Sequence, residues 1–151
     1  TLAWSCPKAA QGPESWGAQR WGFSAVSVFA VPYWKIFVFG GNSGNLDASR
    51  PQGTHLNDIQ VLECIISQSG TDSSGMSWSR PKIADSADKP TPRADTEMFY
   101  SDDLGKLVLF GGWSNQWHDE VYTCEARDIV GPPYNIFSIQ SPEWSSATGP
   151  V

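Results

Sequence analysis

The sequence has few basic residues and no cluster of them. Its 151 residues include 10 Lys and Arg against 16 Asp and Glu, a formal net charge of -6 at pH 7. Nucleic acids and anionic membranes are bound through patches rich in lysine and arginine, so we expect neither as a partner. We also find no secretory leader and no apolar run close to transmembrane length.

Cysteine is scarce as well. The three cysteines, Cys6, Cys64 and Cys124, are odd in number and lack the paired spacing of a zinc site. The sequence has no Asn-x-Ser/Thr acceptor for N-glycosylation. These absences favour a reducing, cytoplasmic compartment with free thiols, and the sequence alone leaves one disulfide open.

Helical periodicity is missing too, since no stretch longer than a turn or two repeats its apolar residues at helical spacing. The chain instead has 14 Gly, 11 Pro, 8 Trp, 7 Phe and 4 Tyr. Frequent turn residues between short apolar runs predict an all-β fold. With 40% hydrophobic and 17% charged residues, the chain can form a packed core.

The apolar runs recur along the chain. The stretch KIFVFGG at 35–41 returns as KLVLFGG at 106–112, each time ending in a glycine pair. Three more markers recur in the same order. WSCPK at 4–8 returns as WSRPK at 78–82, and Arg20 returns as Arg93. NDIQVLE at 57–63 returns as DEVYTCE at 119–125. An ordered series of this kind indicates two copies of one structural unit.

Each copy predicts four short strands. In the first copy the expected strands are 23–28, 35–39, 59–62 and one that carries Trp78. In the second copy they are 97–100, 106–110 and 121–124. Trp4 marks the fourth strand of a further copy whose beginning is missing. The stretch SDDLG at 101–105 predicts a hairpin turn in which Gly105 supplies a positive φ.

The second strand of each copy is apolar on both faces, so its sheet must be covered on both sides. Sheets stacked around a common axis, as in a β-propeller, meet this requirement and leave only short edges exposed. The glycine pair then permits a sharp turn where no side chain fits.

This pattern resembles the kelch repeat, which has an Arg followed by Gly-His-Ser-Ala, an apolar strand ending in Gly-Gly, Asn-Asp before a strand, and a spaced Trp. The matching residues are Arg20, Gly40, Gly41, Asp58 and Trp78 in the first copy, and Arg93, Gly111, Gly112 and Glu120 in the second. The sequence departs from the pattern at Phe23, where kelch repeats often have His, and at 93–96, which lacks the Gly-His step. The resemblance covers residues 1–125 and implies that 1–130 are blades of a kelch-type propeller. Two blades cannot close a ring of about 4–8 blades, so we expect an excerpt of a longer protein.

The tail, residues 131–151, has a different character. A Pro-Pro step leads into an apolar run at 136–139, and Ser-Pro and Gly-Pro follow. This cadence is similar to the first strand of an immunoglobulin-like domain of the filamin/IPT type, and Trp144 fits equally well as the outer Trp of the last blade. A kelch ring followed by such a domain is similar to the N-terminal region of some axonemal outer-arm dynein heavy chains, which implies a ciliary or flagellar axoneme.

Residue types that carry chemistry are sparse. The only histidines, His55 and His118, lie in the loops after the glycine pairs, with Asp58, Asp119 and Glu120 nearby. Their spacing to the acidic residues differs between copies, so we expect neither a metal site nor a cofactor.

There is no Gly-x-Ser-x-Gly, phosphate-binding loop or Cys-x-x-Cys. The copper-radical oxidases with a kelch-like ring need a Tyr/Cys/His cluster, and no Tyr–His pair is set to join the cysteines. We therefore expect no catalysis by this segment, while the dynein resemblance would place a motor ATPase elsewhere in a longer chain.

Residues that do not recur are the candidates for interaction, because the fold does not require them. Asp47 and Arg50 lie in the long polar stretch 42–56, and Trp113, Asn115 and Trp117 lie in WSNQWH at 113–118. An exposed Trp in a polar setting is typical of an interface anchor, although either Trp can instead cover the core. The recurring Arg20, Arg93 and Trp78 are expected to be structural.

Three functions remain open on the sequence. The first is a non-catalytic platform for protein partners, within an axonemal dynein heavy chain that contacts other dynein subunits or axonemal proteins. The second is a cytosolic kelch adaptor that presents substrates to a ubiquitin ligase. The third is a part of a propeller enzyme.

Overall fold

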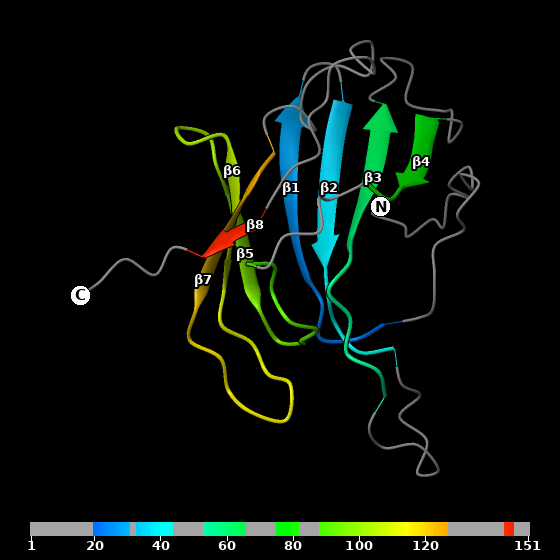
Figure 1. Ribbon diagram of the computed structural model, residues 1–151. Helices are drawn as coiled ribbons and strands as arrows, with labels where there is room; N and C mark the ends of the chain where they lie inside the picture. Colours follow the sequence, from blue (N-terminus) through cyan, green and yellow to red (C-terminus); the bar gives the residue numbers. More distant parts are fainter. Residues whose placement is uncertain are drawn as a thin grey trace, which may run out of the picture.

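The structure, a computed structural model, describes residues 20–30, 33–43, 53–65, 75–81, 88–126 and 144–146. In these ranges the chain is all-β, as predicted, and forms two antiparallel sheets of four strands each (Figure 1). The first sheet contains β1 (Ser24–Ala30), β2 (Tyr33–Phe39), β3 (Ile59–Ile65) and β4 (Met76–Ser79). The second contains β5 (Glu97–Ser101), β6 (Lys106–Phe110), β7 (Val121–Glu125) and β8 (Trp144–Ser146). In both sheets the strand order follows the chain.

The strands of the first sheet are longer than the apolar runs that predict them. The pairing of β1 with β2 continues to Ala30 and Tyr33, and that of β2 with β3 continues to Tyr33 and Ile65. Continued backbone pairing therefore extends these strands beyond their most apolar part. The predicted hairpin between β5 and β6 is present: Gly105 has φ 66, and its N–H donates to the Ser101 carbonyl at 2.8 Å.

The two sheets share one register. Ser24 pairs with Phe39 in the first sheet, and Glu97 pairs with Phe110 in the second. The outer strands also correspond, because Leu62 pairs with Trp78 as Cys124 pairs with Trp144. Trp144 therefore lies in the outer strand of the second sheet, and residues 144–146 complete that sheet. The remaining tail residues lie outside the described residues.

The core lies between the two sheets, which meet through non-equivalent faces. Successive residues of a strand point to opposite faces of its sheet. From β2 the core takes Phe37 and Phe39, whereas from β6 it takes Leu107 and Leu109. Phe39 corresponds to Phe110 by register, so the core residues of β6 belong to the opposite face. The sheets are thus stacked front to back, in the manner of successive layers.

Backbone hydrogen bonds join the sheets along a seam beside the glycine turns. The Gly41 N–H donates to the Arg93 carbonyl at 3.0 Å, and the Arg93 N–H donates to the Leu56 carbonyl at 3.0 Å. The Asp95 N–H donates to the Gly22 carbonyl at 2.7 Å. Residues 42–43 and 53–56 after the first glycine pair, and the loop 113–118 after the second, lie at this end of the sheets, the lower end in Figure 1. The seam therefore fixes the spacing between the two loops.

Candidate functional site

The glycine pairs form turns that need their lack of a side chain. Gly40 and Gly41 have φ 62 and 92, and Gly111 and Gly112 have φ 65 and 108. All four values lie in the left-handed region that L side chains rarely adopt. After each turn the chain returns in the same way, since the Leu56 N–H donates to the Gly41 carbonyl at 2.9 Å and the His118 N–H to the Gly112 carbonyl at 2.9 Å.

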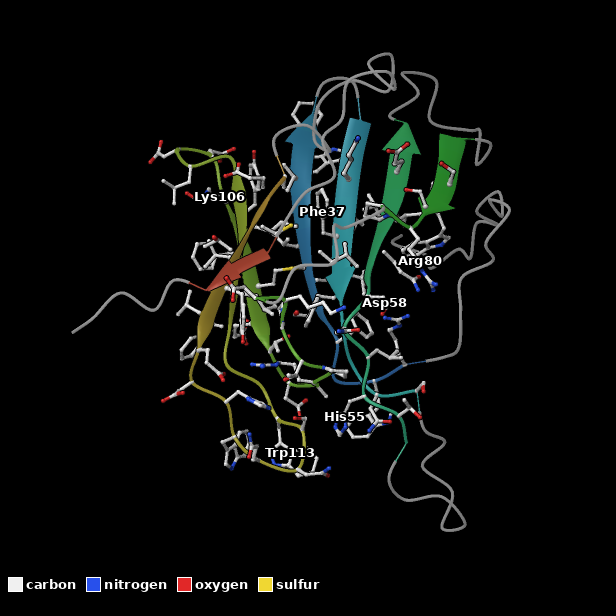
Figure 2. All side chains as sticks on the ribbon, viewed as in Figure 1. Phe37, His55, Asp58, Arg80, Lys106 and Trp113 are labelled. Atoms are coloured by element: carbon white, nitrogen blue, oxygen red, sulfur yellow. The ribbon has the colours of Figure 1, made fainter. Side chains whose placement is uncertain are left out.

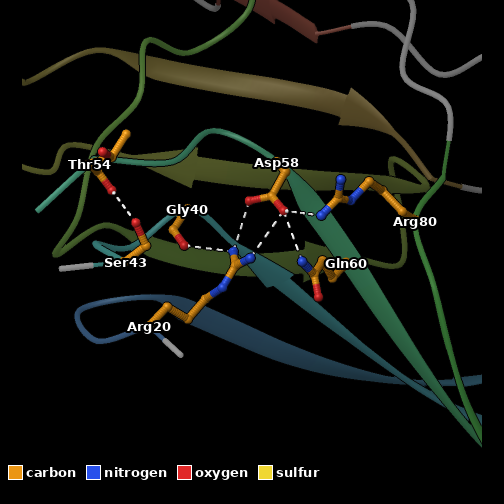
Figure 3. Close-up of polar contacts among 7 residues, drawn as sticks. All are labelled: Arg20, Gly40, Ser43, Thr54, Asp58, Gln60 and Arg80. Atoms are coloured by element: carbon orange, nitrogen blue, oxygen red, sulfur yellow. Dashed lines mark hydrogen bonds and ion pairs between the residues drawn. The ribbon is translucent and has the colours of Figure 1, made fainter. Parts of the chain in front are cut away.

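Arg20 ties the first glycine turn to the start of β3. Its guanidinium donates to the Gly40 carbonyl at 3.0 Å and forms a two-point contact with Asp58, at 2.8 Å to Oδ1 and 3.1 Å to Oδ2 (Figure 3). The Asp58 carboxylate also accepts from Gln60 Nε2 at 2.9 Å and pairs with Arg80 at 3.4 Å. Because Arg20 is buried and bonded to two chain segments, it serves the fold rather than a surface site.

Arg93 repeats this arrangement in the second sheet. Its Nη1 donates to the Gly111 carbonyl at 3.0 Å and to Glu120 Oε2 at 3.2 Å, as Arg20 does to Gly40 and Asp58. Its Nε and Nη2 donate to the carbonyl and hydroxyl of Thr91 at 3.1 and 2.8 Å. Its guanidinium also lies 5.4 Å from the centre of the Tyr122 ring. In each copy the first glycine of the pair and the acidic residue before the third strand thus meet at a buried arginine side chain.

The pKa of Asp58 reflects this setting. Burial alone would raise it, but hydrogen bonds from Arg20 and Gln60 and the charges of Arg20 and Arg80 hold the pKa below the usual value for Asp. A lowered folded-state pKa stabilises the fold above the unfolded-state pKa, and this contribution is lost as the pH falls through the folded-state pKa.

We therefore expect Asp58→Asn to cost about 1–3 kcal/mol of unfolding free energy at pH 7, because charge-assisted hydrogen bonds are lost. The difference from wild type should begin to shrink as the pH falls below about 4, the unfolded-state pKa of Asp, and should disappear below the lowered folded-state pKa, where Asp58 becomes protonated. Urea unfolding at a series of pH values measures this. A difference that stays constant down to the most acidic pH would show that the charge of Asp58 does not contribute.

The loop between β6 and β7 contains a polar chain that the sequence did not indicate. Ser114 Oγ lies 2.7 Å from His118 Nε2, and His118 Nδ1 lies 3.4 Å from Glu120 Oε2. The order Ser–His–carboxylate is that of a nucleophilic triad. Here, however, the carboxylate is the partner of buried Arg93 and stands where Asp58 stands in the first sheet. The contacts therefore hold the loop onto the second sheet. The spacing S-x-x-x-H-x-E at 114–120 could have suggested them, but it is too general to predict a contact.

The two tryptophans of this loop differ in exposure, and Trp113 lies at the same end of the sheets as His55 (Figure 2). Trp113 is half-buried, exchanges backbone hydrogen bonds with Ala94, and its ring centre lies 5.5 Å from that of His55 in the first sheet's loop. Trp117 is 79% exposed. Asn115 is exposed too and has φ 64. Trp117 and Asn115 thus remain surface candidates, whereas Trp113 bridges the two loops.

The other predicted interaction residues, Asp47 and Arg50, lie outside the described residues. Two cysteines are free, the buried Cys124 and the partly buried Cys64. Burial, together with the charge of Glu125, raises the pKa of Cys124 to about 12, and burial raises the pKa of Cys64. Neither thiol has the lowered pKa of a reactive cysteine. Cys6 lies outside the described residues.

Two further features are absent from the described ranges. Among those residues, no three His, Cys, Asp or Glu side chains lie together in a way that could hold a metal ion. The described part of the chain also contains no helix with the length and apolar character needed to cross a membrane.

Comparison with known proteins gives one informative match. No family model matches the sequence. Over 120 residues, 80% of its length, the chain is 33% identical to "Dynein alpha chain, flagellar outer arm" of Chlamydomonas reinhardtii. The match spans 2% of the length of that relative. The chain is therefore similar to a small region of a flagellar dynein chain.

Proposed function

We propose that this chain is a pair of kelch-type propeller blades that acts as a non-catalytic docking platform for proteins in a dynein heavy chain of the ciliary or flagellar outer arm. The observation that carries the proposal is the exposure of Trp117 and Asn115 on the loop between β6 and β7, which the Ser114–His118–Glu120 contacts hold to the second sheet. Similarity to the flagellar dynein chain supports the setting in an axoneme.

Three features support the kelch-type architecture. The sheets are stacked front to back, which suits radial repetition. Each glycine pair has the positive φ that its turn requires, and each preceding arginine joins that turn to the acidic residue before the third strand. The partners in this proposal are other dynein subunits or axonemal proteins, met in the cytoplasm or in the axoneme.

The cytosolic ubiquitin-ligase adaptor is the second proposal for the same platform, and the dynein similarity favours the first. For a propeller enzyme, the Ser114–His118–Glu120 chain is the relevant observation. Its carboxylate is already the partner of Arg93, so a structural task accounts for it.

The replacement Trp117→Ala tests the platform. We expect it to weaken binding to purified outer-arm dynein subunits, or to axonemes stripped of outer arms, by at least tenfold, as for an interface anchor of about 2 kcal/mol. The melting temperature should hardly change, because the Trp117 side chain is largely in solvent. Co-sedimentation with axonemes and titration with the purified subunits measure binding.

Leu104→Ala is the matched control, since Leu104 is an exposed apolar residue on the β5–β6 turn. It should bind like wild type. Absence of wild-type binding to both dynein subunits and stripped axonemes would refute the dynein platform. Equal binding by wild type and Trp117→Ala would remove Trp117 as its anchor.

A further inference from the structure

One side of the second sheet is turned away from the first sheet (Figure 1). We call it the outer face, and by register its side chains include those of Glu97, Phe99, Val108, Phe110 and Val121. Val108, at its centre, is buried, whereas Phe99 and Phe110 are 54% and 51% exposed. The outer face therefore presents two large aromatic side chains to solvent.

The equivalent face of the first sheet is covered by the second sheet. By register, Phe39 corresponds to Phe110, and Ser24 corresponds to Glu97. Phe39 is fully buried in the core between the sheets, and the hydroxyl of Ser24 lies 2.8 Å from that of Thr96 in the second sheet. The outer face is thus the repeat of a face that a neighbouring sheet covers.

Main-chain groups at the edge of the outer face give an independent observation. In the seam between the sheets, the first sheet uses the Gly41 N–H and the carbonyls of Gly22 and Leu56. The corresponding groups of the second sheet are the Gly112 N–H and the carbonyls of Asp95 and His118. None of these three has a hydrogen-bond partner among the described residues. They repeat the half of the seam that the first sheet supplies.

A sheet that covers this edge needs small residues where it meets the turn. In the second sheet, Ala94 and Thr96 are buried, and the Ala94 Cβ lies 3.2 Å from the position that a Cβ on Gly22 would occupy. The first sheet has Trp21 and Phe23 at the corresponding positions, and both are exposed. The first sheet of another copy is therefore a poor neighbour for the outer face, because two large rings would have to fit where Ala and Thr fit in the seam.

We propose that a third four-stranded sheet of the same repeat packs on the outer face, supplied by the longer chain of which we expect these residues to be an excerpt. In this contact, its turn corresponding to 93–95 supplies a carbonyl to the Gly112 N–H and N–H groups to the carbonyls of His118 and Asp95. Its apolar strands cover Phe110 as the second sheet covers Phe39. The inference rests on the proposed function, because it extends the stacking of propeller-like layers.

The contact also sets the chemistry of two positions in the third sheet. Glu97 stands where Ser24 stands in the first sheet, so its carboxylate faces the position of the third sheet that corresponds to Thr96. A carboxylate removed from water requires a hydrogen-bond donor. We therefore expect a donor side chain, such as Thr, Lys or Arg, at that position. The residue that corresponds to Ala94 should be small.

Photo-cross-linking in the full-length chain identifies the covering segment. With p-benzoylphenylalanine in place of Phe110, we expect a cross-link within the chain, to a segment that has its own apolar strand and glycine pair. The same group in place of Leu104, an equally exposed residue on the β5–β6 turn, should not cross-link to that segment. Mixing isotopically labelled and unlabelled chains separates links within a chain from links between chains. A link from position 110 to another kind of segment, to a second molecule or to nothing contradicts the proposal.

Thiol accessibility gives a second measurement on the full-length chain. Phe110→Cys should react with a maleimide at least about tenfold more slowly than Leu104→Cys in the native state, and equally fast in urea. The natural Cys124 is fully buried, so its lack of reaction reports that the two sheets are intact. Phe99→Cys replaces Phe110→Cys if Cys124 becomes reactive. Equal native labelling of the two introduced thiols would show that the outer face is in solvent, and this overturns the proposal.

The two proposals fail separately. Rapid labelling at position 110 in a chain that still binds stripped axonemes through Trp117 would remove the third sheet and retain the platform. A protected position 110 in a chain that binds neither axonemes nor dynein subunits would do the reverse.

Discussion

Replacing Gly112 by valine is expected to lower the free energy of unfolding by about 4 kcal/mol or more, among the largest effects for a single substitution. Gly112 has φ 108, and a Cβ there would lie 2.5 Å from Thr96 Cγ2 and 2.9 Å from the Ala94 carbonyl oxygen. Thr96 cannot easily move away, because its hydroxyl lies 2.8 Å from that of Ser24 in the buried contact between the sheets. Urea unfolding followed by tryptophan fluorescence measures the change.

Asn115→Val provides the matched control. Asn115 also has a positive φ, 64, but it is exposed, so a β-branched side chain there meets strain without a collision. We expect a cost of about 1–2 kcal/mol at this site. If the two substitutions cost the same, the close approach at Gly112 has no energetic consequence.

The second large effect is expected for Arg93→Met, which keeps most of the side-chain bulk and removes the charge and every donor. The Gly111 carbonyl loses its hydrogen bond in a buried place, at about 1–3 kcal/mol for an unsatisfied group, and the Thr91 carbonyl loses one in a partly buried place. Glu120 is partly exposed, so solvent limits the penalty for leaving it unpaired. We expect a total loss of about 3–4 kcal/mol, measured by chemical unfolding.

Arg80→Met is the control for this prediction. Arg80 also pairs with a carboxylate, that of Asp58 at 3.4 Å, but its side chain is 46% exposed, against 1% for Arg93. Its replacement should cost less than about 1 kcal/mol. A loss for Arg93→Met as small as that for Arg80→Met would mean that the arginine is not the centre of the second turn.

The features that the sequence predicts are those fixed by local chemistry. The strands around Phe37 and Leu107 follow from apolar runs that end in turn residues, and the glycine pairs from the need for a positive φ. The repeat also predicts a structural role for Arg20 and Arg93. A residue that recurs at the same position of each copy is expected to stabilise the fold that both copies share.

The features that the sequence left open depend on contacts between distant segments. Trp144 lies in a three-residue strand, too short for any periodic pattern, and its partner Cys124 is known only from the pairing of β7 and β8. Trp113 and Trp117 have similar surroundings in the sequence, yet only Trp113 meets His55, because the seam brings the two loops together. The position of a side chain relative to another sheet is a tertiary property, which spacing cannot supply.

The seam has a consequence for folding. The amide groups of Gly41, Arg93 and Asp95 form their hydrogen bonds only while both sheets are in contact. Separation of the layers would leave these amides without their partners and would expose Phe37 and Leu109 to water. Neither half of the chain can melt alone without this penalty, so the duplicated units share a single cooperative transition.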